Sequence, residues 1–398
     1  MNLDVVTPSA TAIAYTTGVE MDFAFTEDQE AVRDLAGQIF TDACNHERSR
    51  ELEDAGAWMD DKLWSELATS NLTAVTVPES CGGSGLGLTE CALMLVEAGR
   101  HCVPAPLFET LVLGGLPIAK FGNPEQQKRW LGPVVDSGAV LTAALSEHGS
   151  SDPSRPKLKA TRDGDGWRLD GEKFSVPAVG KASCILVPAS IEGGKVGVFL
   201  VAGDAAGLEI AEQRSINWQL QGLVKFNGVT VSDADILGDP DTGADIVNWI
   251  VDHARLGQAA LLLGVGEEAL KRTAMYLSER KQFGRQIGSF QAVQMRCADA
   301  YIDLMGMRST LWQAVWRVDT GIRSGAEVRA AKWWASRAGD RVVHSAQHLH
   351  GGIGSDIDYP IHRYFLWAQY LKSQLGGPSQ LLAELGALLV SDDQRPSL

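Results

Sequence analysis

The sequence predicts a three-part fold: a helical region, then a small β region, then a second and longer helical region. Three observations carry this prediction. Apolar residues recur at helical spacing up to about residue 140, short β-branched runs occupy 141–240, and helical spacing returns from 241 onward. A chain of 398 residues has room for two or three domains. We therefore expect a helical domain at 21–140, a β domain at 141–240 and a helical bundle at 241–398.

The chain begins with a segment that resembles neither a helix nor a leader. Residues 1–20 are rich in Ser, Thr and Ala and lack the basic start and apolar centre of a signal peptide. We interpret them as a flexible extension, with Met21 as a possible alternative start. The first helix should begin at Thr26, because "TEDQ" forms a capping box with Gln29 at its third helical position.

The two later regions differ in their sequence patterns. "WRLDGEKFSV", "SCILVPAS", "GKVGVFLV" and "VKFNGVTV" are strand-like runs parted by turn residues, which favours a small antiparallel sheet or barrel. Four later segments, near 242–277, 288–320, 325–350 and 378–390, are long enough to form a four-helix bundle. The glycine-rich stretch "HGGIGSDIDYP" at 350–360 interrupts them.

Composition excludes several classes of function. The net charge of −15 would repel a phosphate backbone, so nucleic acid is not an expected partner. None of the six cysteines has C-x-x-C spacing, which speaks against a zinc site and a redox dithiol and favours free thiols in a reducing cytoplasm. No apolar run approaches the ~20 residues of a membrane span. We expect a cytoplasmic protein.

Four motifs in order give the chain a resemblance to the acyl-CoA dehydrogenase family. They are "VTVPESCGGSGLGLTE", "ILGDPDTGAD", "ERKQFGRQIGSFQ" and "GGIGSDIDYP", and the resemblance runs from Met21 to about Leu389. It implies FAD bound between the subunits of a tetramer and removal of hydrogens from Cα and Cβ of an acyl-CoA thioester. A carboxylate would take the proton and the flavin the hydride. It also implies electron-transfer flavoprotein as the electron acceptor.

The resemblance assigns a set of residues to the FAD of a neighbouring subunit. Arg280 would face the diphosphate, Phe283 would pack near the adenine, and Gln291 would hydrogen-bond to the dinucleotide. Glycines would let backbone N–H groups approach the cofactor closely. Family members often have Gln three residues before the first loop glycine, where this chain has His348 preceded by Gln347, and either could make the contact. The expected glycine set is Gly351, Gly352 and Gly354.

Both positions at which the family carries its catalytic carboxylate hold other residues here. The stretch matching Y-E-G-T is "LGGPSQ", with Gly376 at the place of the Glu, or Leu375 if the register slips by one. The second place, counted back from Arg280, is Ala254. Asp252 and His253 are close in sequence, but each residue of a helix is rotated by about 100° from the next. We expect surface roles for both.

The contacts expected for this chain's own flavin ring are also altered. The family's T-E-P-x-A-G-S-D becomes "SEHGSSD", which is one residue shorter and keeps a hydroxyl at Ser146 while the rest is altered. The family's W-I-T becomes Ser175-Val176-Pro177, and proline has no N–H donor. The residues that would serve a neighbour's cofactor are therefore present, whereas those that would serve this chain's own reaction are not.

This division resembles the non-base subunit of heteromeric α2β2 acyl-CoA dehydrogenases that act on steroid side-chain CoA thioesters. The similarity is greatest over "AQHLHGGIGSDIDYPIHRYF", at 346–365. A homologous partner would supply the glutamate and the ring pocket. Three alternatives stay open: an active homomeric acyl-CoA dehydrogenase with an unrecognised base, a flavin monooxygenase of the same fold, and a structural subunit without cofactor.

Overall fold

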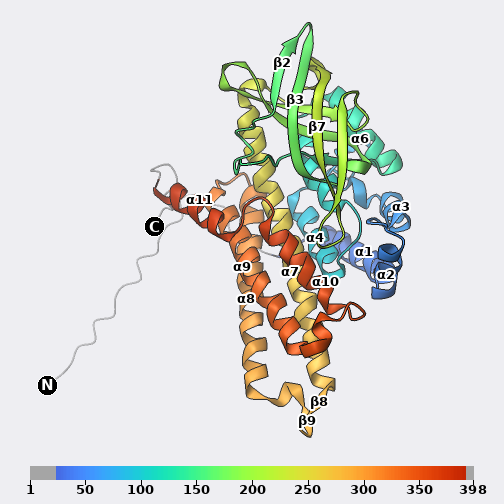
Figure 1. The fold of residues 1–398 in the computed structure, drawn as a ribbon, viewed down its shortest axis with the longest axis vertical. Coiled ribbons are helices and arrows are strands. Elements are labelled where there is room, and N and C mark those ends of the chain that lie inside the picture. The colour runs from blue at the N-terminus through green and yellow to red at the C-terminus, as the bar shows by residue number, and fades with distance from the viewer. Residues whose placement is uncertain (1–23, 391–398) are drawn as a thin grey trace, which may run out of the picture.

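The computed structural model describes residues 24–390, so the expected flexible extension at 1–20 lies outside the described residues. The three regions occupy different parts of the molecule (Figure 1). The sheet lies at one end of the long axis, the C-terminal helices extend to the other end, and the N-terminal helices pack beside the junction between them.

The N-terminal region is built from short helices around buried apolar side chains. Thr26 caps the first of them with both bonds of a capping box, as predicted. A π-helical turn, η3 (Glu109–Gly115), lies in the middle of this region. The helices are α1 (Glu27–Ala43), α2 (His46–Asp54), α3 (Asp61–Thr69), α4 (Leu88–His101), α5 (Leu116–Phe121) and α6 (Pro124–Ser137).

The middle region is one seven-stranded sheet with the order β1-β4-β2-β3-β7-β6, and β5 pairs with β4. Most neighbouring strands are antiparallel, but β4 runs parallel to β1 and to β2. The sheet is therefore mixed, whereas the sequence predicted an antiparallel one. Its curled inner face has its own apolar core. The strands are β1 (Val140–Ala143), β2 (Lys159–Asp163), β3 (Gly166–Pro177), β4 (Ala182–Ser190), β5 (Val196–Ala202), β6 (Leu208–Arg214) and β7 (Leu220–Ser232).

The C-terminal region contains the four predicted long segments and one further helix, α10. Short strands β8 (Lys281–Gln282) and β9 (Arg285–Gln286) form a hairpin between its first two helices, and a short turn of helix, η9 (Gly351–Ser355), follows the third. The helices are α7 (Gly243–Glu279), α8 (Gln291–Asp319), α9 (Gly325–His350), α10 (Ile361–Ser373) and α11 (Pro378–Val390). Among the described helices, none combines the length and apolarity needed to cross a membrane.

The two helical regions share one hydrophobic core, because α4 lies directly against α7. Two glycines allow this close crossing. A Cβ added to Gly99 would come 2.1 Å from the carbonyl oxygen of Leu261, and one added to Gly264 would come 1.9 Å from that of Val96. The position of α7, which runs from the sheet to the far end of the bundle, is therefore fixed by backbone contact (Figure 1).

Candidate functional site

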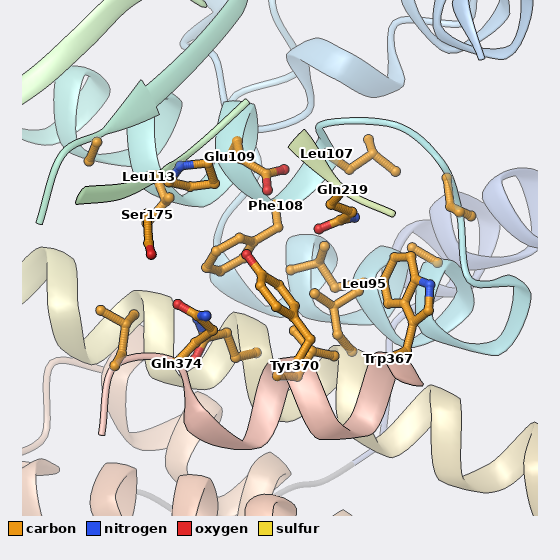
Figure 2. A pocket seen from close by; sticks show the side chains of 18 of the residues that line it. Leu95, Leu107, Phe108, Glu109, Leu113, Ser175, Gln219, Trp367, Tyr370 and Gln374 are labelled. Atoms are coloured by element: carbon orange, nitrogen blue, oxygen red, sulfur yellow. The ribbon is translucent and has the colours of Figure 1, made fainter. Parts of the chain in front are cut away.

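A narrow pocket lies where α4, η3, β1, β3, α7 and α10 meet (Figure 2). Its cavity volume is about 50 Å³. Aromatic and aliphatic side chains dominate the lining, among them Leu95, Phe108, Leu113, Leu261, Trp367 and Tyr370. The side chains therefore leave a slim apolar cavity and not a wide cleft.

The two positions at which a catalytic carboxylate was expected lie against the same arginine. Ala254, in α7, is fully buried, and Arg255 follows it. Arg255 Nε donates a hydrogen bond to the carbonyl oxygen of Leu375 at 3.0 Å. Gly376 has a φ of +107°, and a Cβ added there would come 3.4 Å from Arg255 Nη2. The backbone at this place favours glycine and has a guanidinium as its neighbour.

Two buried cations hold the end of α10 that precedes Gly376. Lys332 Nζ donates to the carbonyl oxygen of Leu371 at 2.7 Å, and burial, then the charge of Arg255, lowers the pKa of Lys332 to about 7. Arg255 is paired in turn with Glu384 at 2.8 Å. Burial would raise the pKa of Glu384, but its hydrogen bond with Arg255 contributes to a net lowering. Glu384 is thus kept ionised and paired, which makes it a poor proton acceptor.

The expectation of surface roles for Asp252 and His253 is wrong for His253. Its ring is buried and stacks on Trp249, with ring centroids 3.5 Å apart. Burial lowers the pKa of His253 to about 4. Asp252 is half-buried and lies 3.4 Å from Arg329, and burial raises its pKa despite that cation. Neither residue lines the pocket, so neither replaces the missing carboxylate there.

One carboxylate that the sequence interpretation missed does line the pocket. Glu109 begins the π-helical turn and is 5% exposed. Burial raises the pKa of Glu109 from 4.5 to about 7, and only a hydrogen bond to its own backbone opposes that rise. Gln258, on α7, is another buried polar residue of the lining. A signal was present in "LFETLVLGG", where one acidic residue interrupts an apolar run.

The residues expected to contact this chain's own flavin ring lie on the β side of the pocket. Ser146, Ser175 and Pro177 all line it. Ser175 falls where the pairing of β3 with β7 shifts register, and its φ is +49°. The carbonyl oxygen of Pro177 accepts a hydrogen bond from Thr142 Oγ1 at 2.7 Å, so this group is already partnered. The wall offers two small hydroxyls and a proline ring.

Arg280, Phe283 and Gln291, which were assigned to a neighbour's cofactor, lie at the opposite end of α7 (Figure 1). Arg280 and Phe283 belong to the β8–β9 hairpin and the residue before it, and Gln291 begins α8. Arg280 and Gln291 are exposed, and Phe283 is 91% exposed with a φ of +54°. Phe290 anchors the hairpin, because Arg285 stacks over its ring at 4.0 Å. The ring of Phe283 is therefore accessible to another molecule.

The glycine loop η9 lies at the same end of the bundle, although some seventy residues separate it from the hairpin. The ring of Tyr276, near the end of α7, stacks on His350 with centroids 4.5 Å apart. Gly351 and Gly352 are exposed, and a Cβ added to either would meet nothing within 4 Å. Gly354 is buried, and its Cβ would come 2.4 Å from the carbonyl oxygen of Gln347. The loop therefore presents open backbone on its outer side.

The structure gives Gln347 and His348 different environments. Gln347 is half-buried, and its Nε2 donates to the carbonyl oxygen of Gly354 at 3.1 Å, which ties the loop to α9. His348 is exposed and faces a groove between α8 and α9 that is also lined by Arg296 and Arg341. Of the two, His348 has the side chain that is accessible to a partner.

Comparison with known proteins gives a consistent picture over nearly the whole chain. Residues 26–137 match the family model described as acyl-CoA dehydrogenase, N-terminal domain, and residues 241–387 match the model for the C-terminal domain. The chain is 37% identical to acyl-CoA dehydrogenase FadE27 of Mycobacterium tuberculosis over 374 residues, which cover 92% of this chain and 98% of that protein.

Two solved structures are similar in both sequence and fold. A variant of the Tcur3481–Tcur3483 steroid ACAD shares 44% identity, with a TM-score of 0.85 over 91% of this chain and 98% of that one. The ChsE4–ChsE5 complex of Mycobacterium tuberculosis shares 37% identity, with a TM-score of 0.87 over 93% of this chain and 99% of that one.

Proposed function

The chain belongs to the acyl-CoA dehydrogenase family, and we propose that it is the subunit of a heteromeric, FAD-dependent acyl-CoA dehydrogenase that completes the cofactor site of a partner chain. The partner is a homologous subunit that carries the catalytic glutamate, and two copies of each chain form an α2β2 heterotetramer. The reaction is α,β-dehydrogenation of an acyl-CoA thioester, with electron-transfer flavoprotein as the electron acceptor.

One observation carries this proposal: the two halves of the expected machinery differ within one chain. At the hairpin end, Arg280, Phe283 and Gln291 are present and exposed. Near the pocket, Ala254 and Gly376 occupy the two places at which the resemblance expects a base, and Gly376 lines the adjoining outer space. A chain that retains these cofactor-binding residues but lacks a catalytic base can take part in the reaction only beside a partner chain that carries the base.

The residues at the exposed end fit the dinucleotide part of FAD. Arg280 supplies a cation for the diphosphate, and the open backbone at Gly351 and Gly352 lets N–H groups reach phosphate oxygens. Phe283 offers an aromatic face to an adenine. When bound in the complex, FAD would provide the acceptor for the hydride that leaves the acyl β-carbon. The small side chains at Ser175 and Pro177 do not supply the ring contacts that the resemblance requires, so we assign the ring pocket to the partner.

We propose a bulky steroid side-chain CoA as the substrate. One relative supports this choice, since it is described as a steroid ACAD. The cavity of about 50 Å³ in this chain has no room for a polycyclic acyl group, so such a group must be bound mainly by the partner subunit.

A homomeric enzyme with its own base is the second candidate, because Glu109 lies in the pocket with a pKa near 7. Glu109 lines the inner pocket, however, whereas Gly376 and Arg255 line an adjoining outer space that does not include it. The alternative of a flavin monooxygenase would need a ring pocket in this chain, and Ser175 and Pro177 give it no support.

Flavin content measured by visible absorbance tests the proposal. The full chain is purified alone and after co-expression with a homologous acyl-CoA dehydrogenase subunit that carries the glutamate. We expect a colourless single chain and a yellow, stoichiometric complex that bleaches on addition of a steroid side-chain CoA. A yellow single chain that bleaches with an acyl-CoA would overturn the proposal and would make Glu109 the first residue to mutate.

A further inference from the structure

A small second pocket lies where the three regions of the chain meet, and we call it the junction pocket. Its cavity volume is about 40 Å³. One wall is formed by α2 and the segment after it, another by the turn between β6 and β7, and a third by α10. Gln219 and Trp367 line this pocket as well as the apolar one, and Figure 2 shows them at one end of the latter. The junction pocket is therefore a separate space beyond those two side chains.

The turn between β6 and β7 buries a polar side chain in the wall of the junction pocket. Asn217 is 6% exposed and belongs to the lining. Its Oδ1 accepts a hydrogen bond from Ser215 Oγ at 2.5 Å, but its Nδ2 has no hydrogen-bond partner among the described residues. Native proteins rarely leave a buried donor unpaired, because an unmade hydrogen bond destabilises the fold. The missing acceptor should therefore come from a bound molecule.

The next residue of the turn has a strained backbone. Trp218 has a φ of +67°, in a region that favours glycine and that a bulky side chain occupies only at a cost in energy. Trp218 is also 42% exposed, so burial of the indole offsets only part of that cost. Two further indoles, those of Trp58 and Trp367, line the same pocket. Strain of this kind is typical of residues that contact a ligand.

The charged side chains of the lining already neutralise each other. Arg363 Nη2 donates to Glu53 Oε2 at 3.0 Å, and the two side chains are 13% and 11% exposed. A charged ligand would therefore lose its hydration without gaining a counter-ion. The hydroxyl of Ser49, in the same wall, donates to the carbonyl oxygen of Asn45 at 3.0 Å. These contacts favour an uncharged ligand.

The unpaired atom specifies a carbonyl group. Among the lining residues, all of which the structure describes, Asn217 Nδ2 is the one buried side-chain polar atom without a partner, and it is a donor. A ketone or ester oxygen accepts a hydrogen bond and brings no donor of its own. An alcohol brings an O–H that needs a further acceptor, and a buried water needs about two to four polar partners.

We propose that the junction pocket binds a compact, uncharged ketone or ester, with its carbonyl oxygen accepting from Asn217 Nδ2 and its alkyl groups among Trp58, Trp218 and Trp367. A cavity of about 40 Å³ admits only the few atoms around the carbonyl. This site is distinct from the cofactor residues at the hairpin end and does not depend on the proposed role toward a partner's FAD.

Saturation-transfer NMR titrations of the full chain test this proposal with three molecules of one shape, which are 3-methylbutan-2-one, 3-methylbutan-2-ol and isobutyrate. We expect the ketone to bind about fivefold more tightly than the alcohol, since the alcohol leaves its O–H without an acceptor. Asn217→Asp keeps the acceptor for Ser215 but removes the donor, so the ketone should bind at least about tenfold more weakly. Asn227→Asp, the same change at an exposed residue of β7, is the matched control and should bind the ketone as the wild type does.

A second variant, Trp218→Gly, separates binding from folding. Glycine adopts a φ of +67° without strain, so the temperature of thermal unfolding should not fall. The affinity for the ketone should nevertheless fall several-fold, because an indole is lost from the lining.

Four results would overturn the proposal. No detectable binding of the ketone would mean that water fills the pocket, and equal binding of ketone and alcohol would remove the carbonyl specificity. Tighter binding of isobutyrate would make Arg363 an anion site, and unchanged ketone binding in Asn217→Asp would place the ketone elsewhere on the chain. Flavin content of the complex should be the same for the wild type and all three variants, so failure here is distinguishable from failure of the proposed FAD role.

Discussion

The interior pocket and the hairpin end of the bundle differ in packing, in exposure and in the residues they carry. The pocket is narrow and apolar, and beside it Gly376 and Ala254 occupy the two positions at which the resemblance expects a carboxylate. The hairpin end is exposed, yet it carries an arginine, an aromatic ring and open glycine backbone together. Packing is therefore no guide to which region is functional.

The largest expected effect concerns the pocket. Because burial raises the folded-state pKa of Glu109 from 4.5 to about 7, the unfolded chain releases this proton at lower pH than the folded chain does. Stability from this group is therefore lost as the pH rises from 4.5 to 7, and the whole penalty remains above 7. Glu109→Gln should raise the free energy of unfolding by about 3 kcal/mol at pH 8 and hardly change it near pH 4.

Urea denaturation of wild type and Glu109→Gln at both pH values measures this difference. His253 titrates in the same range with the opposite sign, so its contribution cancels only when the two proteins are compared at one pH. An equal stability change at pH 4 and pH 8 would show that Glu109 is not held protonated by the pocket.

The second effect concerns the hairpin end. Arg280→Ala in this chain should lower the FAD affinity of the whole complex about tenfold or more, because it removes a charge-assisted contact to the diphosphate. The measurement is flavin retained by the complex after gel filtration, with the assembly state followed in the same run. Arg155→Ala is the matched control, since Arg155 has a largely exposed side chain in a loop of the middle region. Full flavin in the Arg280→Ala complex would refute a shared site.

The same contrast explains which features sequence patterns could predict. The cofactor residues near the hairpin and in the glycine loop were assigned from the family resemblance, because their motifs are short local stretches of sequence, but the β8–β9 hairpin itself was not predicted. Glu109 was missed because its burial in the pocket depends on α7 and α10, which are distant from it in sequence. His253 was placed at the surface by an argument from one helical face, but α7 is buried on all sides from His253 to Gly266. A helix that is buried on all sides has no exposed face, so the direction in which a side chain projects does not predict that it is exposed.

The helix α10 was missed for a different reason. Pro360 was interpreted as the end of a glycine-rich loop, whereas it is the N-cap residue directly before α10. Its buried residues Ile361, Tyr364, Ala368 and Leu371 follow helical spacing, so the signal was present in the sequence. This helix also positions the segment at 374–376, and that segment could not be located without it.

The third effect concerns the glycine loop and distinguishes the roles of two adjacent residues of α9. Gln347→Ala removes the hydrogen bond to Gly354 and should release the glycine loop, at a cost of about 1 kcal/mol in local stability. His348→Ala leaves the loop intact and should act only on what binds the groove between α8 and α9. Amide hydrogen exchange at 351–355 should speed up in the single chain for Gln347→Ala alone. Faster exchange in both variants would mean that the two side chains hold the loop jointly.

The smallest expected effect is on the stability of the chain itself when Phe283 is changed. A side chain that is 91% exposed contributes little to folding, so Phe283→Ser should alter the free energy of unfolding by less than about 0.5 kcal/mol. Its loss should be felt only in the complex, as a several-fold weaker retention of FAD, because an aromatic contact contributes about 0.5–1.5 kcal/mol. Thermal unfolding of the single chain and flavin retention by the complex are measured side by side. If the single chain were destabilised as well, Phe283 would belong to the hairpin's own packing against Phe290, 6.2 Å away, and the exposed end would lose its clearest mark of a partner.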